Sequence, residues 1–362
     1  MGRLSRAETQ ERNRAKVLAA AREEFAERGF RDAKVDGIAE RAELTRGAVY
    51  SNFSGKRALY FAVMAELAER PPDPPHQEPG RTAGEALRAF ARAWLARLPL
   101  ATDDPRGQAR LGMDVLPEVL ADERTRTAFA QLMRLDAILL GLALERLDLG
   151  EGGRRVRAAE AVLTTLHGAS QLAAAAPGFV EPFNVVTACE RLAGLDLDDR
   201  WPPPHLAWAP EARPAGGPWA PPPAFDAVTG RPVPLADDGV VAVLGLHRLE
   251  AAEEAVRAAP PGTRITAVVV TGDPAELLPL ARLAVAEVTG CLRQAFPAAA
   301  QPPLGVVCDE SGAPAAAAGV QGADDGTEVA VRVEAGRVVA RAEGRGACHA
   351  VASTVPSRTT LS

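Results

Sequence analysis

The chain has 362 residues and a formal net charge of −6 at pH 7, and its length predicts two or three domains rather than one small one. It shows neither a signal-like N-terminal segment nor an apolar run of about 18 residues, so we expect a cytoplasmic protein that does not bind a membrane. The four cysteines form no CxxC pair and have no metal-ligand spacing, which predicts reduced thiols, no metal site and no cofactor.

Charge is divided unevenly along the chain. Residues 1–70 hold 14 Lys and Arg against 11 Asp and Glu, a net charge of +3, whereas the remainder holds 27 against 36. A basic first segment followed by an acidic body is typical of a nucleic-acid-binding protein. Because +3 is a small charge, non-specific affinity for DNA should be weak and dimerisation would have to add to it.

Residues 1–70 are expected to form the first domain, whose fourth helix ends near Arg70, and three amphipathic helices precede that helix. The first runs from Arg14 to Gly29, and its apolar face carries Val17, Leu18, Ala21 and Phe25. The second has Val35, Ile38, Ala39 and Ala42 at helical spacing. The third opens after Thr45, a good N-cap residue, and buries Val49 and Phe53. The last two are about three residues apart, which is the spacing of a helix-turn-helix.

The outward face of the third helix is unusual for a structural helix. Small residues there, Gly47 and Ala48, would allow close approach to base edges. The remaining side chains can bond to bases or phosphates, and they are Arg46, Tyr50, Ser51 and Asn52. The alternatives to a DNA contact are that Arg46 is an ordinary solvated arginine and that Tyr50 is a packed surface aromatic.

This segment resembles the TetR family of bacterial transcriptional regulators. The positions that fall in register with the family pattern over residues 10–65 are Ile38, Ala39, Ala42, Gly47, Tyr50, Phe53, Lys56 and Leu59. Glu43 departs from it, because the family usually has Gly at this turn position, where the backbone is often left-handed.

The resemblance implies a role for each matching residue. Arg46, Gly47, Ser51 and Asn52 would face bases in the major groove, while Tyr50, Lys34 and Lys56 would hold phosphates. Thr45 and Ala48 complete the expected DNA-binding set. The resemblance also implies a homodimer on a pseudo-palindromic double-stranded DNA operator, and a small-molecule effector.

Residues 71–200 predict a helical effector-binding and dimerisation domain after a Pro-rich break at 71–80. The last two apolar helices, 156–176 and 180–195, are expected to form the dimer interface. Candidate pocket residues, each also compatible with ordinary core packing, are Trp94, Met113, Phe129, Met133 and His167.

The last 160 residues predict a separate α/β unit. Residues 201–223 read as a Pro- and Trp-rich linker. Residues 224–350 then give the order β-α-β-α-β-α-β-β, with a closing hairpin around residues 334–336, and 351–362 read as a flexible tail. The fold class is therefore multidomain: an all-α helix-turn-helix and helical body, followed by an α/β domain.

The α/β unit looks like a thioredoxin-like domain of the peroxiredoxin type. The resemblance rests on three stretches of the sequence, 223–235, 308–320 and 334–339. Redox members carry a nucleophilic Cys near the start of a helix that follows a long strand, but here that stretch is 247–252 and holds none. Cys291 and Cys308 fall on a helix and at a strand end, as expected of structural residues.

The sequence therefore predicts a TetR-like, dimeric, ligand-responsive repressor that is not an enzyme. Two alternatives concern the C-terminal unit: a thiol oxidoreductase fused to a DNA reader, and an assembly module without catalytic activity.

Overall fold

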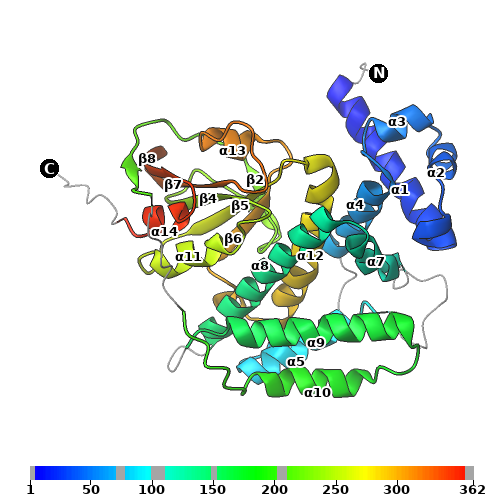
Figure 1. Ribbon diagram of the computed structural model, residues 1–362, viewed down its shortest axis with the longest axis horizontal. Helices are drawn as coiled ribbons and strands as arrows, with labels where there is room; N and C mark the ends of the chain where they lie inside the picture. The colour runs from blue at the N-terminus through cyan, green and yellow to red at the C-terminus, as the bar shows by residue number, and fades with distance from the viewer. Residues whose placement is uncertain (1–4, 71–77, 99–110, 148–152, 202–209, 355–362) are drawn as a thin grey trace.

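Three groups of elements follow one another along the chain (Figure 1). The computed structural model describes residues 5–70, 78–98, 111–147, 153–201 and 210–354. We call residues 5–70 the head, the described residues between 78 and 201 the body, and residues 210–354 the C-terminal part. The Pro-rich break and the flexible tail expected from the sequence lie largely outside the described residues.

The head consists of α1 (Arg6–Asp32), α2 (Val35–Arg41), α3 (Arg46–Tyr50) and α4 (Lys56–Glu69). The expected apolar faces are buried against one another, including Val17, Phe25, Ile38 and Val49. Gly29 adopts φ 72°, which interrupts α1 near the position where the sequence predicted its end.

The body is helical throughout most of its described residues. Its elements are α5 (Ala83–Leu95), η1 (Gly112–Asp114), α7 (Val115–Leu120), α8 (Glu123–Leu147), α9 (Val156–Ala175) and α10 (Pro182–Leu192). By length and composition alone α8 could cross a membrane, but 67% of its apolar stretch is buried inside the protein. Helix α8 packs against α9 of the body and against α12 of the C-terminal part.

The C-terminal part is built on a six-stranded mixed sheet. Its elements are β1 (Arg213–Pro214), β2 (Ala224–Asp226), β3 (Arg231–Val233), β4 (Gly239–Gly245), α11 (Ala251–Ala258), β5 (Ile265–Val270), α12 (Pro274–Ala295), η2 (Ala298–Ala300), β6 (Leu304–Cys308), α13 (Ala313–Ala317), β7 (Glu328–Glu334), β8 (Arg337–Glu343) and α14 (Ala347–Ala352). The sheet order is β1-β8-β7-β4-β5-β6, with β4, β5 and β6 parallel and β7 and β8 antiparallel. From β4 to β8 the order of strands and helices is the predicted one.

The expected linker is partly a component of the sheet. Residues 202–209 lie outside the described residues, but β1 pairs with β8 at the sheet edge. Trp219 is only 3% exposed, and its indole Nε1 donates to the Leu235 carbonyl at 2.6 Å. The linker prediction is therefore wrong from about residue 210 onward. Burial removes the apolar indole of Trp219 from water, and pairing with β1 satisfies the otherwise free edge of β8.

The C-terminal part is not a separate unit. Helix α12 packs against α4, α5 and α8, and one continuous hydrophobic core runs from Val17 in the head to Ala352 in α14. The backbone N–H of Gly80 donates to the Ala295 carbonyl at the end of α12. The sequence predicted α12 to within one residue but gave no signal of which surface it would bury.

Candidate nucleic-acid interface

The turn between α2 and α3 has the geometry that the sequence predicts. Glu43 adopts φ 55°, so a glutamate occupies the left-handed position where the family usually has Gly. Thr45 caps α3, because its Oγ1 accepts the Ala48 backbone N–H at 3.2 Å. The turn ends α2 and starts α3 within four residues, and the outward face of α3 is exposed to solvent.

Arg46 stands exposed at the start of α3. Its guanidinium lies 3.4 Å from the Asp36 carboxylate and 5.5 Å from the centre of the Tyr50 ring. The hydrogen bond to Tyr50 and the charge of Asp36 raise the pKa of Arg46, so it stays cationic. Both partners are themselves exposed, and the guanidinium can leave them for a base edge or a phosphate at little cost.

Gly47 leaves the centre of this face bare. A Cβ added there would meet only the Thr45 Oγ1, at 3.9 Å, and the glycine is exposed. The folded protein therefore does not need glycine at this position. A bare backbone on an exposed helix face suits close approach of another surface.

Two of the expected base-contacting residues also bond within the head. Ser51 Oγ and Asn52 Nδ2 both donate to the Ala48 carbonyl, at 2.9 and 2.8 Å. These bonds close the last turn of α3 and fix the Asn52 side chain against it. Ser51 remains exposed and Asn52 half-buried.

The two lysines expected to hold phosphates are in different surroundings. Lys34 is the exposed N-cap residue of α2. The Lys56 ammonium donates to the carbonyls of Phe30, Arg31 and Ala33, at 2.7, 3.1 and 3.1 Å. An ammonium has three protons, and all three are used at the end of α1. A phosphate contact by Lys56 would therefore have to compete with these carbonyls, which attract a cation because they lie at the end of a helix.

Sequence reasoning missed a buried carboxylate between α1 and α2. Glu24 is 1% exposed, and its carboxylate accepts from Arg41 Nε at 3.0 Å and pairs with Arg28 at 3.1 Å. A Cβ at Gly37 would lie 2.8 Å from this carboxylate, so α2 approaches α1 here because it carries a glycine. The sequence signal was a glutamate on the apolar side of α1.

Three of the five candidate pocket residues form a cluster of ring contacts. His167 contacts the rings of Trp94 and Phe129 edge-on, at centroid distances of 4.9 and 6.2 Å, between α5, α8 and α9. Burial lowers the pKa of His167 to about 4, so it is neutral. Met133 packs half-buried on the core, and Met113 lies in η1. The described residues hold no group of three His, Cys, Asp or Glu side chains able to bind a metal ion.

The comparisons with known proteins fall on the head. Residues 17–63 match the family model described as "Bacterial regulatory proteins, tetR family". Over 65 residues, 18% of this chain, the sequence is 45% identical to two proteins of Pseudomonas putida: the HTH-type transcriptional regulator SrpR and the uncharacterized HTH-type transcriptional regulator TtgW. The matched segment spans 30% and 48% of the lengths of these two relatives.

Solved structures with some likeness cover about half of the chain. A transcriptional regulator from Rhodococcus sp. Rha1 has 24% identity over 52% of this chain and 99% of its own, with a TM-score of 0.35. NalD, the secondary repressor of the MexAB-OprM multidrug efflux pump in Pseudomonas aeruginosa, has 21% identity over 51% and 96%, with a TM-score of 0.32. The family model and the sequence relatives agree on the segment that contains α2, the turn and α3, and the head of this chain belongs to the TetR family of helix-turn-helix domains.

Proposed function

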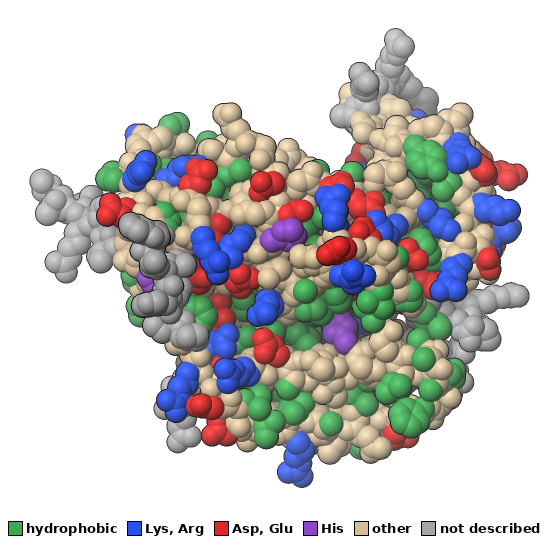
Figure 2. Space-filling model, in the orientation of Figure 1, with side chains coloured by type: hydrophobic (Ala, Val, Ile, Leu, Met, Phe, Trp, Pro, Cys, Tyr) green, Lys and Arg blue, Asp and Glu red, His purple; other side chains and the backbone are tan. Residues whose placement is uncertain are grey.

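We propose that this protein is a transcriptional regulator that binds double-stranded DNA through α3. The observation that carries the proposal is the outward face of that helix: an exposed Arg46 beside a bare Gly47, on a helix-turn-helix of a DNA-binding family. Figure 2 shows Lys and Arg side chains over the head. The direct contacts proposed are Arg46, Ser51 and Asn52 to bases, and Tyr50 and Lys34 to phosphates.

The test is selection of duplex fragments from a genomic pool by the full chain. We expect enrichment of a pseudo-palindromic motif, whose two halves are about one helical turn apart. If the correctly folded protein enriches no sequence motif, the proposal is overturned. A repressor would lower transcription from a promoter that carries the recovered motif.

We further propose a homodimer through α9 and α10. Large apolar side chains on and beside this pair are exposed: Leu172, Phe179, Phe183 and Leu195 are between 44% and 76% exposed. Figure 2 shows hydrophobic side chains on the surface of this region of the body. An adjoining hollow of about 250 Å³ is lined by Arg92, Leu95, Ala96, Pro182, Phe183 and Val186. Exposed apolar area of this kind is typical of a subunit interface.

Substitution of an exposed ring tests the dimer. Phe183→Glu places a charge in the proposed interface and is expected to give a monomer in sedimentation, because a buried unpaired charge opposes association. The matched control is Asp196→Asn, which alters an exposed charge just beyond α10 without adding one to the apolar surface. A dimer that survives Phe183→Glu would place the interface elsewhere.

A small-molecule effector would bind between α5, α8 and α9, beside the cluster of Trp94, Phe129 and His167. A neutral imidazole with an unbonded Nε2 provides one polar group among aromatic rings, which suits a mostly apolar ligand. Ligand binding would favour a spacing of the two α3 helices that no longer matches successive major grooves.

For the C-terminal part we propose a thioredoxin-like fold without redox chemistry. The sheet order β6-β5-β4-β7-β8, with α11 after β4 and α14 after β8, supports the fold. In the loop before α11, Arg248 takes the place where a redox Cys is expected, and its guanidinium donates to the buried Glu328 at 3.0 and 2.7 Å.

The thiol oxidoreductase alternative is not favoured. Burial raises the pKa of Cys189 and Cys291 to about 11 and that of Cys308 to about 12, and it raises the pKa of Cys348 as well. The thiolate is the reactive form, so these thiols would be poor nucleophiles.

A further inference from the structure

Helix α4 is enclosed by other elements and lies close in sequence to the DNA-binding residues. Eight consecutive residues, 58–65, are buried, so neighbours cover α4 on all sides. One side faces α1, and another is covered by α12 of the C-terminal part. Only five residues separate α3 from α4, and the orientation of α4 therefore constrains that of α3.

The C-terminal part binds the start of α4 through Glu276. One carboxylate oxygen of Glu276 lies 2.5 Å from Arg57 Nε, and the other accepts from Ser54 Oγ at 3.1 Å. Ser54 belongs to the segment between α3 and α4. The Glu276 side chain is 19% exposed and that of Arg57 is 25% exposed, so water screens this pair less than a surface pair.

A second contact binds the other end of the same helix. Arg282, nearly two turns further along α12, donates to both carboxylate oxygens of Glu69, at 2.9 and 2.7 Å. Glu69 is the last residue of α4. A bidentate pair fixes direction as well as distance. Two ion pairs thus hold α4 against α12, one near each end of α4.

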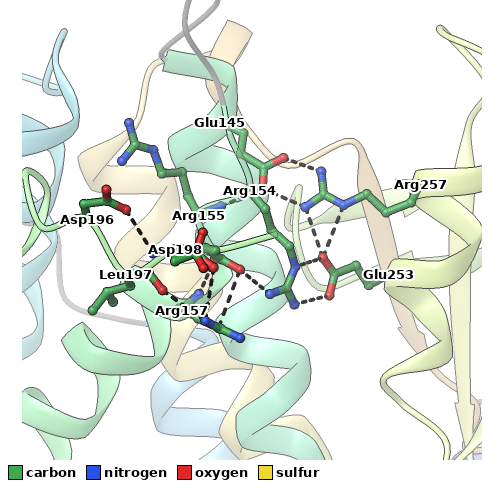
Figure 3. A network of polar contacts seen from close by, with 10 residues as sticks. Glu145, Arg154, Arg155, Arg157, Asp196, Leu197, Asp198, Glu253 and Arg257 are labelled. Carbon is green, nitrogen blue, oxygen red and sulfur yellow. Dashed lines mark hydrogen bonds and ion pairs between the residues drawn. The ribbon is translucent and has the colours of Figure 1, made fainter. Parts of the chain in front are cut away.

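The C-terminal part is itself attached to the body at a third place (Figure 3). Arg154, just before α9, donates to both oxygens of Glu253 in α11 at 2.7 and 2.8 Å. Arg257 of α11 donates to Glu145 of α8 at 2.6 and 2.7 Å. This network joins α11 of the C-terminal part to the two body helices. Because α11 and α12 belong to the same part, a movement of α12 together with the head relative to the body would require these bonds to rearrange.

We propose that the C-terminal part sets the pose of the DNA-binding head, with Glu276 and Arg282 as positioning residues that act through α4. The inference rests on the proposed DNA-binding function. It makes the C-terminal part a determinant of operator affinity through its contacts with α4 and the segment before it. Any ligand or partner that displaces α12 would change the spacing of the two heads in a dimer.

The experiment compares Glu276→Gln and Arg282→Gln in the full chain with a matched control, Glu343→Gln. Glu343 pairs with Arg341 on the surface of the same part, in β8 rather than beside α4. The probes are the duplex recovered by the wild-type protein and a random-sequence duplex of equal length. Both positioning variants should lose affinity for the recovered duplex about 5-fold or more, the lower end of typical couplings between sites. Affinity for the random duplex should stay within about 2-fold, because non-specific binding does not require two aligned heads.

Hydrogen exchange of the amides of residues 46–69 gives a readout that needs no DNA. We expect faster exchange there in both variants than in the control, because α4 loses an anchor. Unchanged affinity ratios together with unchanged exchange would overturn the inference, and so would an equal loss of affinity for both duplexes. If one variant fails to fold, the other decides.

The two proposals fail in different ways. If the wild-type protein recovers no duplex, the proposed function is overturned, and the exchange data alone decide whether α12 positions the head. If the wild-type protein recovers a motif, and both variants bind it and exchange their amides like the control, only the positioning role is overturned.

Discussion

Lys34 and Lys56 have the same charge and lie in the same head, but their ammonium groups have different surroundings. Lys56 donates its three protons to the carbonyls at the end of α1, whereas Lys34 is exposed. Lys56→Met leaves those carbonyls without a donor and should lower the free energy of unfolding by about 1–3 kcal/mol. It should not change the salt dependence of DNA binding.

Lys34→Met is the matched comparison. It should leave the melting temperature unchanged and reduce the slope of log affinity against log salt by about 1, as expected for the loss of one phosphate contact. Thermal melts and DNA titrations at several salt concentrations measure both effects. A reduced salt slope for Lys56→Met would instead support the phosphate role that the sequence predicted for Lys56.

Gly47 offers a test in which folding and binding should change in opposite directions. The protein has room for a Cβ at this position, and Ala stabilises a helix over Gly by up to about 1 kcal/mol. Gly47→Ala should therefore melt no lower than the wild-type protein. It should bind its duplex at least about 10-fold more weakly, because the added methyl group meets the DNA.

Gly84→Ala is the control for this prediction, since Gly84 lies in α5 and its Cβ would make only ordinary contacts with Glu190. Its DNA affinity should equal that of the wild-type protein. Wild-type affinity in Gly47→Ala would mean that this face of α3 does not approach DNA closely.

The local sequence carried enough information for the residues whose role is decided within one turn. Thr45 is an N-cap and Val49 faces the core, because helix periodicity and capping depend on near neighbours. Lys56 and Glu24 each have partners in another helix, and sequence spacing does not show which carbonyl or guanidinium will be nearby. This is why the exposed and buried sides of α3 were predictable and the contacts that support the head from inside were not.

At the scale of elements, the interface between α8 and α12 places two acidic side chains among apolar ones. Asp136 of α8 is fully buried, and the structure shows no hydrogen-bond partner for either carboxylate oxygen among the described residues. Glu287 of α12 lies near it and near Arg97. Burial raises the pKa of Glu287 to about 7, and burial together with the charge of Glu287 raises the pKa of Asp136.

This pair predicts a pH dependence of stability. A carboxyl group whose pKa is raised by folding holds its proton more tightly in the folded state, so the free energy of unfolding falls as pH rises. For Glu287 the fall lies between pH 4.5 and 7 and amounts to up to about 3 kcal/mol. Denaturant titrations at several pH values should show Glu287→Gln flattening this slope.

The matched control for the pH series is Glu343→Gln, which should retain the wild-type slope because its carboxylate is exposed. The double variant Glu287→Gln with Asp136→Asn should flatten the slope further than Glu287→Gln alone. Identical slopes in all variants would mean that the two carboxyl groups have ordinary pKa values in the folded protein.

Element boundaries were predictable where a single period dominated, and element partners were not. The strands Ile265–Val270 and Leu304–Cys308 stand out as short apolar runs rich in β-branched residues, and α12 as a long apolar helix. A helix that is apolar on most sides will be buried, but its sequence does not identify the elements that cover it. The sequence therefore predicted these strands and their helices, and it missed that α12 completes the core of the body.

At the scale of the whole molecule, the continuous core predicts cooperative unfolding. Because α4, α5 and α8 share a buried surface with α12, neither half can lose its structure without exposing apolar area of the other. Calorimetry of the full chain, at fixed protein concentration, should give one transition whose calorimetric and van't Hoff enthalpies agree. Two separated transitions would return the C-terminal part to the status of an independent domain.

Removal of residues 201–362 tests whether the head and the body remain folded without the C-terminal part of the core. The shortened chain would keep every residue of the helix-turn-helix, yet it would expose the faces of α4, α5 and α8 that α12 covers. We expect it to bind a hydrophobic dye, to melt without a cooperative transition and to bind the recovered duplex weakly. A dependence of this kind would explain why a DNA-binding head is joined to the C-terminal part. The C-terminal part covers the apolar faces of α4, α5 and α8. Through Glu276 and Arg282 it also provides the two ion pairs that hold the ends of α4. A shortened chain that melts cooperatively and binds the duplex with full affinity would contradict both roles at once.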